Sequence, residues 1–302
     1  MSEPGATGDL RSGDDLASAV ATFAEVRPRL FGIAYRMLGT VADAEDIVQD
    51  TWLRWQAYDR STVREPAAFL ATATTRLAMN AATSARAQRE TYIGPWLPEP
   101  VDTSHDPTLG AERGEALSFA VLVLLEKLSP AERAAYVLRE AFDYPYAEIA
   151  RIVETSEPSA RQLVSRARKH LEAERKAREV ADGERMRLLT AFMAAAEHGD
   201  MAALEKLFAD DVVSLSDGGG VVRATRIPVI GAQTVAKYIH AFASRFWEGS
   251  ALHLAELNGG PAIVATRDGE VFAFVTADLD DSGIHDLFWV LNPSKLGHVP
   301  GV

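Results

Sequence analysis

The spacing of apolar residues changes at about residue 180, and this change restricts the folds that the chain can adopt. Before it, apolar residues recur every three or four positions, as over residues 30–38, which predicts amphipathic helices. After it, two helix-like stretches (186–208 and 232–246) accompany short valine-rich alternating runs at 211–215, 262–265, 271–276 and 286–291. The sequence therefore predicts a multi-domain protein with two all-α domains followed by an α+β domain.

Composition limits the chemistry that the chain can carry. Of its 302 residues, 47% are hydrophobic and 25% are charged, as in ordinary folded proteins. It has no cysteine, which excludes disulfides, thiolate metal sites and cysteine nucleophiles and fits a reducing, cytoplasmic location. We expect no membrane span, because no apolar run approaches the ~20 residues needed, and no signal peptide.

Charge is distributed unevenly along the chain. The net charge is −12, and residues 179–302 hold 9 basic and 17 acidic residues. Residues 151–178, in contrast, hold 8 basic and 4 acidic residues. An acidic chain can therefore still carry a basic segment that binds nucleic acid.

Residues 91–110 separate the two helical domains. Four prolines, two glycines and no lysine or arginine predict a linker rather than a helix. The same stretch contains Tyr92, Ile93, Trp96 and Leu97, which a solvated spacer would not carry. We therefore expect this linker to dock against a folded surface.

The strongest local motif is a helix-turn-helix over residues 146–171. A short helix (146–153) leads into a turn (154–158), where Ser156 can cap the second helix. The exposed face of that second helix carries arginine, glutamine, serine and lysine, which suit base edges and phosphates in a DNA groove. An ordinary helical hairpin with a solvated basic face is the alternative interpretation.

Two further helices carry candidate binding faces. The helix over 69–89 has a face rich in hydroxyls and amides with Arg76 and Arg86, which suits unstacked single-stranded bases, whereas Trp52 and Trp55 fit the core better. The preceding helix places several carboxylates on one face. Because the seven histidines show no metal-ligand spacing, we expect no metal, cofactor or catalytic residue, and interpret this face as solvated or as a protein-docking patch.

The order of these motifs resembles that of bacterial sigma factors of the extracytoplasmic-function group (group IV). The segments DAEDIVQDTWLRW (43–55), FLATATTRLAMN (69–80) and SRARKHL (165–171) carry the resemblance. WLPEP (96–100), DGGG (217–220) and NPSKL (292–296) resemble the subgroup with a fused, cone-shaped SnoaL-like domain of the nuclear-transport-factor type. The resemblance implies sigma domain 2 at 16–90, the linker at 91–110, sigma domain 4 at 111–178 and the SnoaL-like domain at 179–302.

The resemblance also implies partners, namely core RNA polymerase and promoter DNA, and a role in transcription under stress. For core polymerase it implies Glu45, Asp46, Gln49 and Asp50. For the minus-ten element it implies Tyr58, Arg60, Arg64, Arg76, Asn80 and Arg86. For the minus-35 element it implies Ser159, Arg161, Gln162, Ser165, Arg166 and Lys169. For a regulatory contact between domains it implies Trp96, Leu97, Pro98, Glu99, Pro100, Asp217, Gly218, Gly219, Gly220, Asn292, Pro293, Lys295 and Leu296.

The sequence departs from the family pattern at three of its motif positions. Many of these factors have asparagine and aspartate where this chain has Arg76 and Asn80, so base preference does not carry over. Ser294 stands where the subgroup usually has aspartate. Such factors typically lack a separate membrane anti-sigma partner, which implies regulation in cis by the fused domain. We expect Trp96 and Leu97 to pack near the glycine turn 217–220 and the tail 292–296.

Two other functions remain alternatives. In one, the α+β domain binds a small molecule and the helix-turn-helix sits on an operator, but such a regulator has no use for a polymerase-docking helix. In the other, the SnoaL-like domain is an isomerase or cyclase. Its acid–base candidates would be Asp217, His253, His285 and Asp286, whose spacing forms no recognisable dyad.

Overall fold

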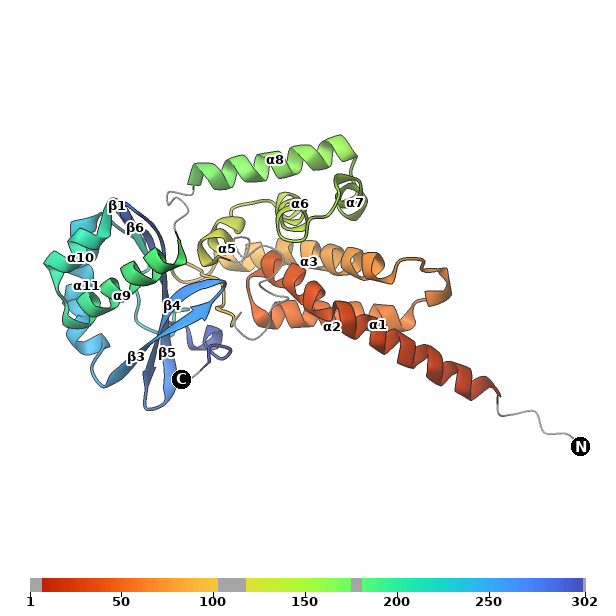
Figure 1. Cartoon of the computed structure of the whole chain (residues 1–302), viewed down its shortest axis with the longest axis horizontal. Coiled ribbons are helices and arrows are strands. Elements are labelled where there is room, and N and C mark those ends of the chain that lie inside the picture. The colour runs from red at the N-terminus through yellow and green to blue at the C-terminus, as the bar shows by residue number, and fades with distance from the viewer. Residues whose placement is uncertain (1–6, 103–117, 175–180, 301–302) are drawn as a thin grey trace, which may run out of the picture.

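The computed structural model describes residues 7–102, 118–174 and 181–300 (Figure 1). The first helical part comprises α1 (Thr7–Leu38), α2 (Val41–Ala57), the 3-10 turn η1 (Arg60–Thr62) and α3 (Pro66–Glu90). The second helical part comprises α5 (Phe119–Leu125), α6 (Pro130–Glu140), α7 (Tyr146–Ile152) and α8 (Glu157–Glu174). Helices are expected from residue 111 to about 180 and are present over the described part of that range, whereas residues 111–117 and 175–180 lie outside the described ranges.

Local sequence explains where these helices begin. The Thr40 hydroxyl accepts from the Asp43 amide at the start of α2. Ser129 and Glu132 form a reciprocal capping box at the start of α6, where Pro130 occupies the first turn. The Ser156 hydroxyl accepts from the Ser159 amide and so caps α8. These caps fix the turns between helices and thereby the directions of the helix faces.

The two helical parts share one hydrophobic core. It extends from Ala19 in α1 to Leu171 in α8 and includes residues of α2, α3, α6 and α7. A buried arginine of α6, Arg133, donates to the backbone oxygen of Met37 at the end of α1 over 2.7 Å. The two parts are therefore packed together rather than joined only by the linker.

The C-terminal domain is a mixed six-stranded sheet with helices on one face, so the predicted α+β class is confirmed. Its helices are α9 (Asp182–His198), α10 (Met201–Leu207), α11 (Ala232–Phe246) and the 3-10 turn η3 (Pro293–Lys295). Its strands are β1 (Phe208–Asp217), β2 (Val229–Ile230), β3 (Ser250–Leu257), β4 (Gly260–Arg267), β5 (Glu270–Asp280) and β6 (Gly283–Val290). The strand order is β2-β1-β6-β5-β4-β3, in which only β1 and β6 pair in parallel.

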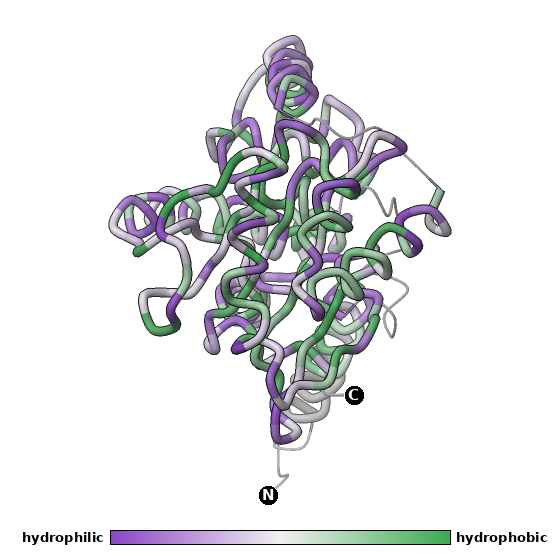
Figure 2. Tube along the Cα trace, turned by 90° about the vertical axis from the view of Figure 1, so that its left-hand side faces the viewer, coloured by the Kyte–Doolittle hydropathy of each residue, from purple (hydrophilic) through white to green (hydrophobic). Residues whose placement is uncertain are grey.

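The inner strands of the sheet are buried on both faces. In β6, Leu287 and Trp289 face the core beneath the helices, whereas Phe288 and Val290 face a second core on the opposite side. That second core is built with Leu97 of the linker and Phe119 of α5. Figure 2 views the molecule from the side of the C-terminal domain and shows hydrophobic and hydrophilic stretches interleaved along the chain. The C-terminal domain therefore holds both the linker and the second helical part.

One expectation about this domain was wrong in detail, and two of its strands were not predicted. The helix predicted over 186–208 is two helices, broken at Gly199, whose φ of +64° ends α9. The strands β2 and β3 were not predicted. β3 is an edge strand whose burial pattern is largely intermediate or exposed, so it lacks the continuous apolar run of the inner strands.

Candidate nucleic-acid surfaces and interdomain junction

The carboxylates predicted on one face of α2 lie on its exposed side. Asp46, Gln49 and Asp50 are exposed, whereas Ile47 and Val48 point into the core. Glu45 is half-buried and accepts from the Arg27 guanidinium over 2.6 Å. Within the described ranges, acidic residues and histidines nowhere form a group that could hold a metal ion. The face is therefore an acidic surface available to a basic partner.

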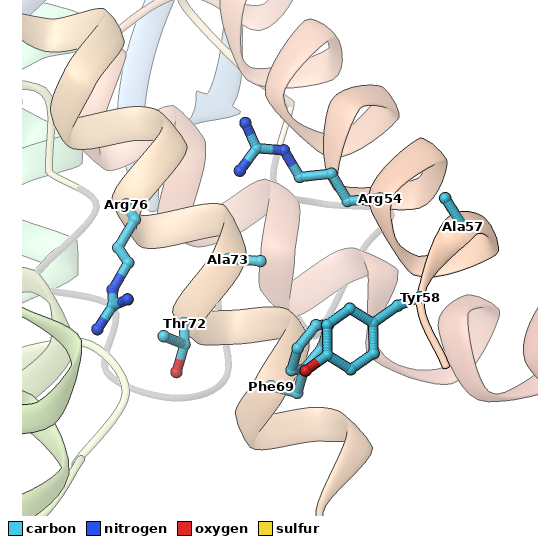
Figure 3. Close-up of a pocket in the computed structure, with 7 residues that line it drawn as sticks. All are labelled: Arg54, Ala57, Tyr58, Phe69, Thr72, Ala73 and Arg76. Carbon is cyan, nitrogen blue, oxygen red and sulfur yellow. The ribbon is translucent and has the colours of Figure 1, made fainter. Parts of the chain in front are cut away.

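A cleft of about 410 Å³ lies between the end of α2 and α3 (Figure 3). The rings of Tyr58 and Phe69 lie 4.6 Å apart at its edge. An aromatic pair flanked by arginines is an arrangement that can stack an unpaired base and hold its phosphate. The lining residues are Arg54, Ala57, Tyr58, Phe69, Thr72, Ala73 and Arg76.

The six residues implied for the minus-ten element do not form one surface. Tyr58 and Arg76 line the cleft, whereas Arg64 lines a neighbouring one. Arg60 donates to the backbone oxygens of Trp55 and Gln56, so it caps the end of α2. Asn80 and Arg86 are exposed farther along α3, outside the cleft.

Sequence reasoning did not identify Arg54, Thr72 or Ala73 as members of this cleft. The helical spacing of residues 69, 72, 73 and 76 would have grouped the last two with Phe69 and Arg76, because these positions share one helix face. The position of Arg54 depends on how α2 crosses α3, which no local pattern gives.

The predicted recognition helix exposes the predicted side chains. In α8, Ala160, Val164, Ala167 and Leu171 are buried. The implied DNA-reading residues Arg161, Gln162, Ser165, Arg166 and Lys169 are exposed. Ser159, half-buried, hydrogen-bonds Ser156 at the cap of the helix.

Both arginines of α8 that are implied for the minus-35 element are held by carboxylates of their own domain. Arg161 donates to Glu157 over 2.6 Å and lies 4.3 Å from the ring centroid of Tyr146. Arg166 donates to Glu132 over 2.9 Å. Phosphate or base contacts would replace these exposed ion pairs, which contribute little on their own.

The linker and the C-terminal domain meet at a buried ion pair. Lys295 donates to the Asp217 carboxylate over 2.7 Å and to the Leu97 backbone oxygen over 2.5 Å. Asp217, fully buried, also accepts from the Leu97 amide over 2.9 Å and from the Tyr92 hydroxyl over 2.5 Å. The structure therefore brings together the three segments 92–97, 217–220 and 292–296, whose regulatory role stays a prediction.

Trp96 connects this junction to both helical parts. The Arg89 guanidinium lies 3.6 Å and the Lys295 ammonium 4.2 Å from a ring centroid of Trp96, within cation–π range. Arg89 also pairs with Glu126 at the end of α5. Glu126 in turn accepts from Arg133 of α6 over 2.6 Å. Neither this arginine–glutamate network nor its link to Trp96 was predicted.

The remaining motif residues shape the contact. Gly219 has φ +61°, and a Cβ there would lie 2.4 Å from the Asn292 amide nitrogen, so only glycine fits. Pro98, Glu99 and Pro100 are buried. The Glu99 carboxylate accepts from the Val41 amide at the start of α2 and from the ring of His298. Gly218, Gly220, Pro293 and Leu296 complete the docked turns.

Tyr35 and Asn258 form a second contact that the sequence did not reveal. The Tyr35 hydroxyl donates to the Glu99 backbone oxygen over 2.6 Å and accepts from the Asn258 amide over 2.7 Å. Asn258 also accepts from the Val101 amide over 3.1 Å. The turn at 258–260 was predicted, but its docking on α1 joins residues far apart in the sequence.

The acid–base candidates of the C-terminal domain do not converge on a reaction centre. His285 meets Asp280 and Ser282 through the same ring nitrogen, Nε2, at 3.0 Å each. A catalytic triad instead needs the carboxylate and the nucleophile on opposite nitrogens. Asp217 is occupied by the junction, and His253 lies on β3 beside Thr266. The geometry does not support the enzymatic alternative.

Burial lowers the pKa of Lys295 to about 8, although its ion pair with Asp217 opposes the shift. In the unfolded chain the pKa is about 10.4. Between these pH values the unfolded chain binds a proton that the folded chain lacks, so the free energy of unfolding rises with pH. We therefore expect the free energy of unfolding of the chain, relative to that of a Lys295→Met variant, to rise from pH 8 to pH 10 by at most about 1.4 kcal/mol per pH unit. Urea unfolding of both proteins measures this difference. A flat or falling difference would contradict the lowered pKa.

Comparisons with known proteins identify the family of the two helical parts. The family model "Sigma-70 region 2" matches residues 22–88, and "Sigma-70, region 4" matches residues 118–171. The extracytoplasmic-function (ECF) RNA polymerase sigma factor SigJ of Mycobacterium tuberculosis is 40% identical over 249 residues, which are 80% of this chain and 78% of the relative. The probable ECF sigma factor SigI of the same species is 29% identical over 276 residues, 89% of this chain and 92% of the relative.

The solved structures give the same relationship. The crystal structure of Mycobacterium tuberculosis SigJ superposes with a TM-score of 0.75 at 33% identity, covering 94% of this chain and all of that one. No described helix of the present chain is long and apolar enough to cross a membrane.

Proposed function

The chain belongs to the extracytoplasmic-function sigma factors of RNA polymerase, and from this membership we propose which partner each of its segments binds. Residues 16–90 bind core polymerase and the minus-ten element, and residues 111–178 bind the minus-35 element. The linker at 91–110 and the domain at 179–302 regulate both in cis. The observation that carries the proposal is the position of the acidic face of α2 beside the aromatic cleft, both within the segment that matches region 2.

The acidic face of α2 is the proposed docking site for core polymerase. Asp46 and Asp50 are exposed, so their carboxylates can meet basic side chains of a partner. Glu45 is oriented by Arg27 and extends the same surface. Because Ile47 and Val48 anchor the opposite face in the core, the surface is rigid.

The cleft is the proposed site for an unpaired base of the minus-ten element. Tyr58 and Phe69 offer ring faces, and Arg54 offers a cation for the adjacent phosphate. A base reaches such a cleft only after the duplex has opened, so binding here favours the melted promoter. Arg161, Gln162 and Arg166 of α8 would read the minus-35 element in the major groove of intact duplex.

The C-terminal domain is proposed to act through contact rather than through a ligand held between its sheet and its helices. Aromatic rings occupy the space between its sheet and its helices: Phe242 and Phe246 lie 5.7 and 5.9 Å from Trp289. The domain is tethered to the linker that it binds, so its effective concentration at the junction is high and a modest contact holds it there. A ligand-sensing role of the space between the sheet and the helices has no comparable observation in its favour.

The proposal is tested by mixing the purified chain with core RNA polymerase. We expect a holoenzyme that survives gel filtration and that initiates from a subset of a genomic promoter library in single-round transcription. Charge reversal of Asp46 and Asp50 should abolish assembly, whereas reversal of the exposed Asp281, in the C-terminal domain, should leave it unchanged. Failure of the unmodified chain to bind core polymerase would reject the proposed function.

Replacing Trp96 with alanine should change promoter activity without unfolding either helical part. The ring meets the cations of Arg89 and Lys295, so its loss removes about 1–3 kcal/mol from the junction while the shared core stays intact. Run-off transcription measures the change, and circular dichroism checks the fold. Trp96→Phe, which keeps an aromatic face, is the control, and unchanged transcription by the alanine variant would contradict the regulatory role.

A further inference from the structure

A cavity beside the interdomain junction is built mainly from one loop of the C-terminal domain. It has a volume of about 370 Å³ and is lined by Ile93 of the linker and by eight residues of the loop 218–226. A cavity of this size can hold a small molecule. None of the rings that fill the space between the sheet and its helices lines it, so it is a separate site.

The backbone of the loop is turned back tightly on itself. The amides of Val221 and Val222 donate to the Gly218 oxygen over 3.0 and 2.9 Å. Gly219 and Gly220 have φ of +61° and +73°, and a Cβ at Gly218 would lie 2.4 Å from the Val222 oxygen. This turn therefore needs glycine at its start, and it fixes one wall of the cavity.

The linker supplies another wall. A Cβ on Gly220 would lie 2.9 Å from the Cδ1 atom of Ile93, so the Ile93 side chain packs directly on the glycine turn. A Cβ on Gly94 would lie 3.6 Å from the Cα atom of Arg226. The cavity is therefore complete only while the linker is docked, and a molecule inside it can touch the linker and the C-terminal domain at once.

The lining of the cavity is cationic. Arg223 and Arg226 are exposed and line it, whereas no acidic residue does. Among the described residues, neither guanidinium has an ion pair or a hydrogen bond. The hydroxyl of Thr225, between them in the sequence, is buried and has no hydrogen-bond partner in the described part of the chain. Two unpaired guanidiniums and an unsatisfied hydroxyl in one concave wall suit a phosphate group.

The sequence keeps carboxylates away from this region. Residues 218–247 contain Arg223, Arg226, Lys237 and Arg245 but no aspartate or glutamate, and we call them the acid-free stretch. The whole domain holds 9 basic and 17 acidic residues, so all of its carboxylates lie elsewhere in its sequence. Within a domain that repels anions overall, this stretch gives a positive local potential.

Exposed apolar side chains adjoin the two arginines. Val221, which lines the cavity, is 78% exposed, and Ile227, next to Arg226, is 71% exposed. A phosphate ion alone would leave them in water, and duplex DNA keeps its bases stacked inside its phosphate backbone. The ring of a small phosphorylated molecule would cover them.

We propose that this cavity binds a small phosphorylated molecule of the nucleotide class, and that the bound molecule holds the linker on the C-terminal domain. Arg223 and Arg226 bind the phosphate oxygens, and Val221 packs against the ring. Because the ligand touches both Ile93 and the loop, it favours the docked linker by mass action. The binding site does not depend on the proposed function, whereas any effect on transcription rests on the proposed regulatory role of the linker.

Calorimetric titration of the whole chain with ATP, pyrophosphate and inorganic phosphate tests the site. We expect saturable binding, tightest for ATP because its base covers Val221. Arg223→Gln together with Arg226→Gln should weaken ATP binding at least about ten-fold, because hydrogen bonds to a charged phosphate are lost.

Lys237→Gln together with Arg245→Gln is the matched control. It removes the same two charges from exposed positions of the acid-free stretch that do not line the cavity, so ATP binding should stay unchanged. An equal loss in both double variants would indicate a net-charge effect and overturn the site. So would the lack of saturable binding of all three probes below about 10 mM.

Hydrogen–deuterium exchange tests the coupling to the linker. Saturating ATP should slow exchange of the Leu97 amide, which donates to Asp217, in the unmodified chain but not in the Arg223→Gln, Arg226→Gln variant. If ATP binds and leaves this exchange unchanged, the proposed hold on the linker is wrong.

A promoter duplex separates the other source of phosphate. If the Arg223→Gln, Arg226→Gln variant loses affinity for the duplex but binds ATP like the unmodified chain, the two arginines contact DNA and the proposal is overturned. If ATP binds as expected but the chain forms no holoenzyme with core polymerase, the proposed function fails while the site stands.

Discussion

Replacing Asp217 with asparagine is expected to detach the linker from the C-terminal domain. The Asp217 carboxylate accepts hydrogen bonds from four groups: the Lys295 ammonium, the Tyr92 hydroxyl and the amides of Leu97 and Gly219. An amide has one acceptor oxygen and would direct its NH2 group toward other donors. It would also leave Lys295 buried without a counter-charge, a loss of about 3–5 kcal/mol when one partner of a buried pair is removed.

Hydrogen–deuterium exchange of the linker is the measurement. The amides of Leu97 and Val101, which bond Asp217 and Asn258 in the docked state, should exchange faster in the variant. The inner strands β5 and β6 should stay protected, because their ladders do not depend on the junction. Promoter selectivity of the holoenzyme should change in parallel.

Two further variants make this result interpretable. Asp281→Asn removes the same charge from an exposed turn of the same domain and should leave linker exchange unchanged. Adding Lys295→Met to Asp217→Asn removes the stranded ammonium and should recover part of the lost protection. Slow linker exchange in Asp217→Asn alone would show that the carboxylate does not hold the linker.

The role of a residue could be predicted from the sequence wherever it depended only on which face of its own helix or segment the residue occupies. The faces of α8 follow from the helical period, since Ala160, Val164, Ala167 and Leu171 are buried and every position named for DNA except the half-buried Ser159 is exposed. The docking of the linker was also foreseeable, because Trp96 and Leu97 have no place in a solvated proline-rich spacer. Leu97 is fully buried in the structure.

Residues whose role depends on a distant partner were missed. Tyr35 and Asn258 are 223 positions apart, and neither belongs to a motif. Arg60 is a basic residue in a loop, which is typical of a DNA contact, but its guanidinium donates to the backbone at the end of α2. The path of the loop determines this contact. Pairings of this kind arise from tertiary packing, so the periodicity of residues within one helix or strand cannot predict them.

The inner strands were predicted from the sequence, but their burial on both faces was not. Residues 262–265, 273–275 and 287–290 are continuous apolar runs rather than the alternating runs that we predicted, as expected of strands buried on both faces. A strand that faced solvent on one side would alternate with polar residues. The runs therefore implied a second layer over the sheet, and the structure identifies it as the linker and α5.

Phe119 is the main side chain of that layer, and replacing it with alanine is expected to release α5 from the sheet. It is 4% exposed, and its ring lies 5.2 Å from Phe274 and 5.5 Å from Phe288. Truncating a buried phenylalanine removes about 3–5 kcal/mol. The sheet face should then bind the apolar dye ANS, and the free chain should bind promoter DNA more tightly because the second helical part is less restrained.

Phe119→Leu is the matched control, because it keeps most of the apolar volume and should give a smaller change in both measurements. An alanine variant with unchanged dye binding and unchanged DNA affinity would mean that the C-terminal domain does not restrain the second helical part through this face.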